Sequence, residues 1–159
     1  MDLLPADGYQ PRANEIAAAA ASEILARLPG TRIEHIGSSA IPGAISKGDV
    51  DLCVLVAPTQ FDYVLCVLEE LGYQQKLDTL RTEQLCMLVS PRRDIDLAIQ
   101  LITLGSEFEF FLTFRDALLA SAELVERYNQ VKLDAAHLPE DEYRSAKSCF
   151  IDAVLAASE

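Results

Sequence analysis

The stretch 37–56, GSSAIPGAISKGDVDLCVLV, decides the fold of this chain. Its first part, 37–48, is dense in Gly, Ser and Pro, and it predicts a loop with one helical turn. Residues 49–56 are apolar and β-branched after two early aspartates, which predicts a buried, central strand. The segment 31–36, TRIEHI, reads as a short strand that ends at Gly37. A Gly-Ser turn therefore joins two strands, and the second strand begins with carboxylates.

Those carboxylates are the first candidate site. Asp49 and Asp51 are two positions apart, and side chains with that spacing point to the same face of a strand. Two like charges repel each other in a half-buried position, and a divalent cation removes that repulsion. Mg²⁺ is commonly held by one or two carboxylates plus substrate phosphates. A third carboxylate, Asp96, lies among apolar neighbours in a later strand. A structural alternative stays open for each of them. Asp49 and Asp51 can be solvated charges at the start of their strand, and Asp96 can be a charge on an edge strand.

The Gly-Ser turn is the second candidate site, for phosphate. Its backbone N–H groups and the hydroxyl of Ser38 are donors that a phosphate can use. Glycine at position 37 also lets the backbone approach a ligand closely. No GxxxxGK[ST] sequence is present, which excludes an independent P-loop kinase on motif grounds.

The rest of the chain alternates helical and strand patterns. Two apolar runs flank the Pro-containing turn 90–93 and predict a hairpin, in which Asp94, Asp96, Ala98 and Gln100 share one face of the second strand. The order of elements indicates an α+β domain with a helical tail. The expected helices are 14–28, 60–71, 107–120, 122–136 and 140–157, and the expected strands are 31–36, 49–56, 80–89 and 94–102.

Composition limits the classes of partner. The chain has 159 residues, with 13 Lys and Arg against 25 Asp and Glu, a net charge of −12. Acidity spread along the chain argues against general affinity for nucleic acid or for an anionic membrane surface. No apolar run is long enough for a membrane span, and the first residues lack the basic segment of a secretion signal. Four widely spaced cysteines among apolar neighbours favour buried, reduced thiols, so a cytoplasmic protein is expected.

The block 33–43, IEHIGSSAIPG, resembles the signature of the GrpB-like family, a bacterial family with the nucleotidyltransferase fold of the polymerase-beta superfamily. The match continues at Lys47, at Asp51 and at 114–118 (FRDAL). It extends into the tail at Tyr128, Lys132, Tyr143, Lys147 and 150–151. One departure is the segment 98–100, Ala-Ile-Gln, where many relatives carry a His-x-His-like element.

The resemblance implies one nucleotidyltransferase-like domain over 1–159, with a core at about 14–104 and a helical tail at about 106–157. Its sheet would be small, mixed or antiparallel, and flanked by helices. The implied reaction moves a nucleoside monophosphate from a nucleoside triphosphate to an unknown small-molecule or protein acceptor. Two Mg²⁺ or Mn²⁺ ions would stabilise the entering and leaving oxygens. The implied metal ligands are Asp49, Asp51 and Asp96, and the implied phosphate-binding residues are Gly37, Ser38, Ser39 and Lys47.

Four further residues are candidates for a supporting role, each with a structural alternative. His35 would support the Gly-Ser loop, or is a hydrogen-bonded strand residue. Arg115 binds phosphate or forms an ion pair. Lys132 and Lys147 form a cationic rim, or simply pack along tyrosines at i,i+4 spacing.

Other functions stay open beside transfer. The chain can instead be a non-catalytic nucleotide-binding or accessory module of the same fold. A toxin-like transferase bound by an antitoxin and assembly into a homo-oligomer are not excluded by the sequence.

Overall fold

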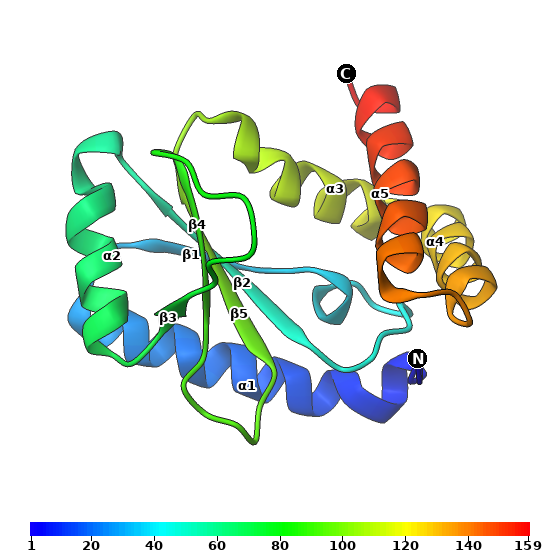
Figure 1. Cartoon of the computed structure of the whole chain (residues 1–159), viewed down its shortest axis with the longest axis horizontal. Coiled ribbons are helices and arrows are strands. Elements are labelled where there is room, and N and C mark those ends of the chain that lie inside the picture. Colours follow the sequence, from blue (N-terminus) through cyan, green and yellow to red (C-terminus); the bar gives the residue numbers. More distant parts are fainter.

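The computed structural model describes residues 1–159 and contains one mixed five-stranded sheet in the order β1-β2-β5-β4-β3 (Figure 1). β2 pairs antiparallel with β1 and parallel with β5, and β4 pairs antiparallel with β5 and with β3. The two most apolar strands, β2 and β5, therefore lie side by side inside the sheet, as their composition predicts. The bounds are β1 Arg32–Ile36, β2 Val50–Val56, β3 Gln74–Gln75, β4 Leu85–Val89 and β5 Leu97–Thr103.

Helices cover both faces of this sheet (Figure 1). α1 (Ala6–Arg27) and α2 (Phe61–Glu70) pack on one face, and α3 (Phe110–Leu119) packs on the other. α4 (Ala122–Ala135) and α5 (Glu140–Ala157) pack against α3 and against the loop that follows β1. Short 3₁₀ turns occur at Ser38–Ala40 (η1), Pro58–Gln60 (η2) and Glu107–Glu109 (η3). The expected α+β class, with a helical segment after the sheet, is confirmed.

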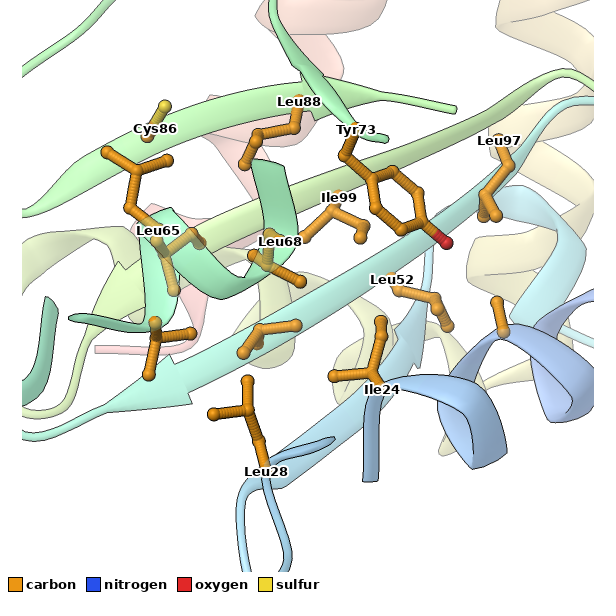
Figure 2. Packing of buried hydrophobic residues seen from close by; sticks show 14 of the residues in the cluster. Ile24, Leu28, Leu52, Leu65, Leu68, Tyr73, Cys86, Leu88, Leu97 and Ile99 are labelled. Carbon is orange, nitrogen blue, oxygen red and sulfur yellow. The ribbon is translucent and has the colours of Figure 1, made fainter. Parts of the chain in front are cut away.

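The main core lies between the sheet and the pair α1 and α2. Alternate residues of β2, including Leu52, point into this core together with Ile24 of α1, Leu68 of α2 and Ile99 of β5 (Figure 2). The intervening residues of β2 point to the opposite face, where Cys53 joins a smaller cluster beneath α3. Because strand side chains alternate, Asp51 also faces the side of α3, α4 and α5.

The first helix is longer than expected. The pattern predicts a start at Asn14, but α1 begins at Ala6 after Pro5, and it contains Pro11 in its second turn. Burial explains the difference, because Tyr9 and Ala13 pack into the core although proline disfavours this segment. Other bounds differ mainly at strand ends, since the first hairpin strand begins at Leu85 rather than at 80 and the two-residue edge strand β3 is not foreseen.

The expectation of four buried cysteines is wrong for two of them. Cys53 and Cys86 are buried in strands, whereas Cys66 and Cys149 are exposed, and all four are free thiols. The exposed pair lies on the outward faces of α2 and α5, where an apolar local sequence does not settle which way one helical residue points. None of the helices combines the length and the apolarity that crossing a bilayer requires.

Candidate functional site

The site begins where β1 ends against β2. Ile36 is the register partner of Asp51, so Gly37 follows directly beside that carboxylate. Gly37 has φ +73°, and a Cβ at this position would lie 2.7 Å from Oδ2 of Asp51. Two separate requirements therefore select glycine here, namely the left-handed backbone and the space that the carboxylate occupies. The Gly-Ser turn and the strand carboxylate form one compact unit.

Asp49, directly before β2, and Asp51, its second residue, face the helical tail. Oδ1 of Asp49 accepts a hydrogen bond from Oγ of Ser46 at 3.0 Å. Burial and the nearby charge of Asp49 together raise the pKa of Asp51 to about 7, although Lys147 and Lys47 act in the opposite direction. The positive charges nearby therefore do not offset desolvation and repulsion in full, and a bound cation would relieve both.

Asp96 stands apart from this pair. It is exposed and precedes β5, and its backbone oxygen accepts from the N–H of Val50 at 2.8 Å. The residue directly across from Asp51 on β5 is Ala98. No group of three or more His, Cys, Asp or Glu side chains is arranged to hold a metal ion. The protein therefore presents two neighbouring carboxylates, Asp49 and Asp51. Asp96 lies on the same face of the sheet, but at an exposed position just before β5.

Such a pair fits Mg²⁺ or Mn²⁺ when a nucleotide supplies the remaining oxygens. Magnesium retains several waters, and in phosphoryl-transfer sites it is held by one or two carboxylates plus substrate phosphates. A magnesium ion at this position would therefore not need to take all of its ligands from the protein. The raised pKa of Asp51 is the feature of this structure that favours a cation at the pair.

Lys132 of α4 reaches the Gly-Ser turn from the tail. Its side chain is only 1% exposed, and Nζ donates to Oγ of Ser38 at 3.0 Å and to the backbone oxygen of Ile45. Nζ also lies 4.3 Å from the ring centroid of Tyr128. Burial and the positive charge of Lys147 together lower the pKa of this ammonium to about 7, although Asp49 acts in the opposite direction. Helix α4 thus places a desolvated cation directly on the predicted phosphate-binding turn.

Lys147 of α5 adds a second cation. It lies 5.4 Å from the ring centroid of Tyr143 and makes no hydrogen bond or ion pair with the chain. Burial lowers its pKa, while Asp49 and Asp51 act in the opposite direction. An ammonium that is largely desolvated and has no bonded acceptor is available to an anionic ligand.

These groups line a single cavity of about 250 Å³ between the sheet and the tail. The two carboxylates and the Gly-Ser turn form one wall, and the tail contributes Lys132, Arg144 and Lys147 together with Glu140, which forms an ion pair with Arg144. A larger, open depression of about 680 Å³ lies beside Phe61 and Arg81 and contains none of the predicted site residues. The cavity includes Gly37, Ser38, Ser46, Lys47, Asp49, Asp51, Lys132, Arg144 and Lys147.

His35, Ser39 and Arg115 do not line this cavity. Nε2 of His35 lies 2.7 Å from Oγ of the buried Ser39, so this pair links β1 to the turn that follows it. Burial lowers the pKa of His35, and the charge of Arg115 lowers it further. Arg115 donates to the backbone oxygen of His35 at 3.0 Å and pairs with Glu34 and Asp116, which fixes β1 to α3. In this arrangement all three residues support the loop from outside.

The loop is held by residues that the sequence pattern does not single out. Nε2 of Gln10 in α1 donates to the backbone oxygen of Ile41 at 2.7 Å, and the hydroxyl of Tyr9 donates to that of Ala44 at 2.9 Å. Asn129 of α4 accepts from the N–H of Ile45 and donates to the oxygen of Gly43, both at 2.9 Å. Polar side chains that bond to the backbone of a distant loop leave no local signal, although Asn129 is a polar residue beside the buried Tyr128.

Comparison with known proteins places the chain among proteins of one family. The family model described as "GrpB protein" matches residues 6–157. The UPF0157 protein VC_A0354 of Vibrio cholerae is 44% identical over 155 residues, which are 98% of this chain and 82% of that protein. The crystal structure of the conserved protein GrpB from Enterococcus faecalis superposes with a TM-score of 0.78 at 21% identity, over 99% of this chain and 96% of that one.

The fold is also shared with a larger enzyme. The structure of the Cid1 poly(U) polymerase with bound MgGTP superposes with a TM-score of 0.56 at 20% identity. The superposition covers 80% of this chain but only 42% of the polymerase chain. The likeness therefore concerns the fold of one part of that enzyme.

Proposed function

This chain belongs to the GrpB family, and from that premise we propose that it is a metal-dependent nucleotidyltransferase. The proposed reaction transfers a nucleoside monophosphate from a nucleoside triphosphate to a small-molecule or protein acceptor and releases pyrophosphate. One observation carries the proposal: the Asp49 and Asp51 pair and the Gly37-Ser38 turn share a cavity with cations of the tail. That combination suits a ligand with several phosphates and a divalent cation.

The phosphates would bind at the turn and between the tail cations. Lys132 already donates to Oγ of Ser38, so it holds the turn and places positive charge beside it. Lys147 has no bonded acceptor and faces the same space, and Lys47 at the cavity edge adds a third positive charge. A phosphate can replace the water that each ammonium would otherwise need, which makes these contacts strong in a desolvated site.

Asp49 and Asp51 would hold Mg²⁺ or Mn²⁺ together with the substrate phosphates. When bound, the metal neutralises charge that develops on the α-phosphate and on the leaving pyrophosphate. Ser46 orients Asp49 through the hydrogen bond to Oδ1. Gly37 keeps Asp51 in place, because only a glycine leaves room for its Oδ2. Asp96 lies on the same face of the sheet but does not line this cavity, so Asp51 is the carboxylate that would accept the proton of the acceptor hydroxyl.

The helical tail belongs to the same functional unit in this proposal. Lys132 and Lys147 come from α4 and α5, whereas the carboxylates and the turn come from the sheet. We therefore treat 1–159 as one nucleotidyltransferase-like domain in which the tail completes the phosphate site. Separation of the tail from the sheet would remove three of the cations that line the cavity, namely Lys132, Arg144 and Lys147.

A non-catalytic nucleotide-binding module is the second candidate function. Two observations favour it, namely that Asp96 is exposed just before β5 and that Ala98 occupies the position across from Asp51. Such a module would bind the nucleotide and its metal at the same pair and turn, but it would not activate an acceptor.

A thermal-shift panel separates these functions. The four nucleoside triphosphates are added at millimolar concentration with Mg²⁺ or Mn²⁺, and the melting temperature is compared with that in each metal alone. A ligand that binds only the native state raises the melting temperature, and Asp51→Asn should abolish the rise. Asp152→Asn, on an exposed position of α5, is the matched control and should keep it.

Pyrophosphate release in the presence of candidate acceptors then reports transfer. A shift with release supports the transferase, and a shift without release across acceptors supports the binding module. The absence of any shift with either metal would contradict both.

A further inference from the structure

A second cavity of about 190 Å³ opens on the other side of Asp51. It shares Gly37, Ser38, Asp51, Tyr128 and Lys147 with the charged cavity, but most of its other wall is apolar. Phe110 and Phe111, from the first turn of α3, form much of that wall. The two cavities therefore meet at the buried carboxylate, one suited to charge and the other to an uncharged group.

The apolar cavity has the features of a binding site for a ring. The rings of Phe110 and Phe111 stack with centroids 4.3 Å apart and planes 26° apart, and both residues remain partly exposed. Aromatic faces that do not complete their packing within the protein favour a further planar partner. A volume of about 190 Å³ is below the roughly 300–1,000 Å³ of sites for drug-sized ligands, so one ring group fits and a large ligand does not.

Polar groups converge at one end of this cavity. Gln100 of β5 pairs with Cys53 of β2, so its side chain lies on the same sheet face as Asp51. The side-chain amide of Gln100 makes no hydrogen bond with the chain, although the residue is only partly exposed. An amide can both donate to and accept from a hydroxyl. A ring against the two phenylalanines would thus present a hydroxyl between Gln100 and Asp51.

We propose that this cavity binds the acceptor, and that the acceptor is a phenol-type group, a planar aromatic ring that carries the reacting hydroxyl. The inference rests on the proposed transferase function and names its second substrate. In the step, the acceptor O–H bond breaks and its proton passes to Asp51, the one carboxylate that lines this cavity. The acceptor oxygen forms a bond to the α-phosphorus, and the bond from that phosphorus to pyrophosphate breaks.

Charge distinguishes the two cavities as sites for the two substrates. Lys47, Lys132 and Arg144 line only the first cavity, and of the cations only Lys147 reaches the second. A triphosphate therefore belongs in the first, and an uncharged ring belongs in the second. Asp51 forms a wall of both, which brings the hydroxyl of one ligand next to the phosphates of the other.

The test uses 4-ethylphenol as the probe and the full chain without nucleotide. Binding is followed by amide chemical shifts in NMR, and perturbations are expected around Gln100, Phe110 and Phe111. Ethylbenzene, which lacks the hydroxyl, and cyclohexanol, which lacks the flat ring, should each bind more weakly. Gln100→Met keeps the size of the side chain and removes its hydrogen bond, so affinity for 4-ethylphenol should fall about three- to tenfold.

Gln74→Met on the exposed edge strand β3 is the matched control, and it should leave the affinity unchanged. Phe111→Leu tests the ring contact with a small change in volume and should also weaken binding. If 4-ethylphenol binds no better than cyclohexanol, or if Gln100→Met has no effect, the inference is wrong.

Two further experiments distinguish a nucleobase, a small phenol and a tyrosine side chain as the group that occupies the cavity. Saturating nucleoside triphosphate with Mg²⁺ should leave 4-ethylphenol bound, whereas its displacement by the nucleoside part alone would assign the cavity to the nucleobase and overturn the proposal. Transfer to a tyrosine-containing peptide rather than to 4-ethylphenol would identify a protein as the source of the phenol group. Phenol binding without any nucleotide-dependent thermal shift would contradict the transferase function and leave the apolar site intact.

Discussion

Oδ2 of Asp51 occupies the space in which a side chain at Gly37 would begin, since a Cβ there would lie 2.7 Å from it. The positions of the Gly-Ser turn and of the Asp51 carboxylate therefore depend on each other. A substitution at Gly37 acts on both, through the backbone and through the carboxylate.

Gly37→Ala should lower the melting temperature and abolish the nucleotide-dependent thermal shift. Gly37 has φ +73° and ψ −176°, a region that essentially only glycine adopts, so an L-residue there costs about 1–3 kcal/mol, and the contact with Asp51 adds to that. For a domain of this size each kcal/mol corresponds to about 2–4 °C. Thermal unfolding with and without nucleoside triphosphate measures both effects.

Gly30→Ala is the control for the backbone alone. Gly30 has φ +81°, but a Cβ there would meet nothing within 4 Å. This variant should be less destabilised than Gly37→Ala and should keep its nucleotide response. Equal losses in the two variants would mean that the contact with Asp51 has no effect of its own.

Lys132→Met should remove a pH dependence of stability. Because the pKa of Lys132 is about 7 when folded and near 10.5 when unfolded, the unfolded chain binds the extra proton between these values. Stability from this group therefore rises as pH increases from about 7 to 10.5 and is absent below pH 7. Urea unfolding across pH 6.5–10 should show a flatter profile for the variant than for the wild type, and nucleotide binding should be weakened.

Asp51→Asn should raise the stability of the metal-free protein at neutral and higher pH. The folded pKa of about 7 lies above the ordinary value of 3.8, so the stability from Asp51 is complete below about pH 4 and lost as pH rises through 7. The amide cannot ionise and avoids this loss. Urea unfolding with a chelator at pH 5 and pH 8 measures the difference, and a variant less stable than the wild type at pH 8 would contradict it.

Asn129→Leu should loosen the loop without unfolding the protein. The side chain makes two hydrogen bonds to the loop backbone, and loss of both leaves the N–H of Ile45 and the oxygen of Gly43 without these partners. The expected cost is about 1–3 kcal/mol, with weaker nucleotide binding. Gln130→Leu next to it, whose amide bonds only to Asp134 on the surface, should change neither property by much.

The sequence predicts the parts of the site that one strand and one turn contain. The two-residue spacing places Asp49 and Asp51 on one face of the sheet. The alternation in the second hairpin strand correctly predicts that Gln100 and its neighbour Ile99 point to opposite faces of the sheet. Both features depend on local geometry alone. The order of the helices and the interior position of the strand 50–56 follow from apolar periodicity in the same way, although the middle strand of the sheet is β5.

Contacts between distant segments are not predictable in this way. That Lys132 bonds to Ser38, across 94 positions, depends on how α4 packs against the loop. The start of α1 at Ala6 likewise depends on burial of Tyr9, which outweighs the proline after it. For Asp96 the strand pattern gives the correct face but not the distance to the pair, since pairing of β5 with β2 puts Ala98 beside Asp51.

The order of the elements along the chain affects how the site forms during synthesis. The turn and the carboxylates leave the ribosome first, while Lys132 and Lys147 follow about 80–110 positions later. A nascent chain that ends before α4 therefore holds two repelling carboxylates and a loop that lacks the contacts of Lys132 and Asn129. Any chemistry that depends on those cations begins only after α5 has emerged, so translation itself delays it until the sheet has been synthesised.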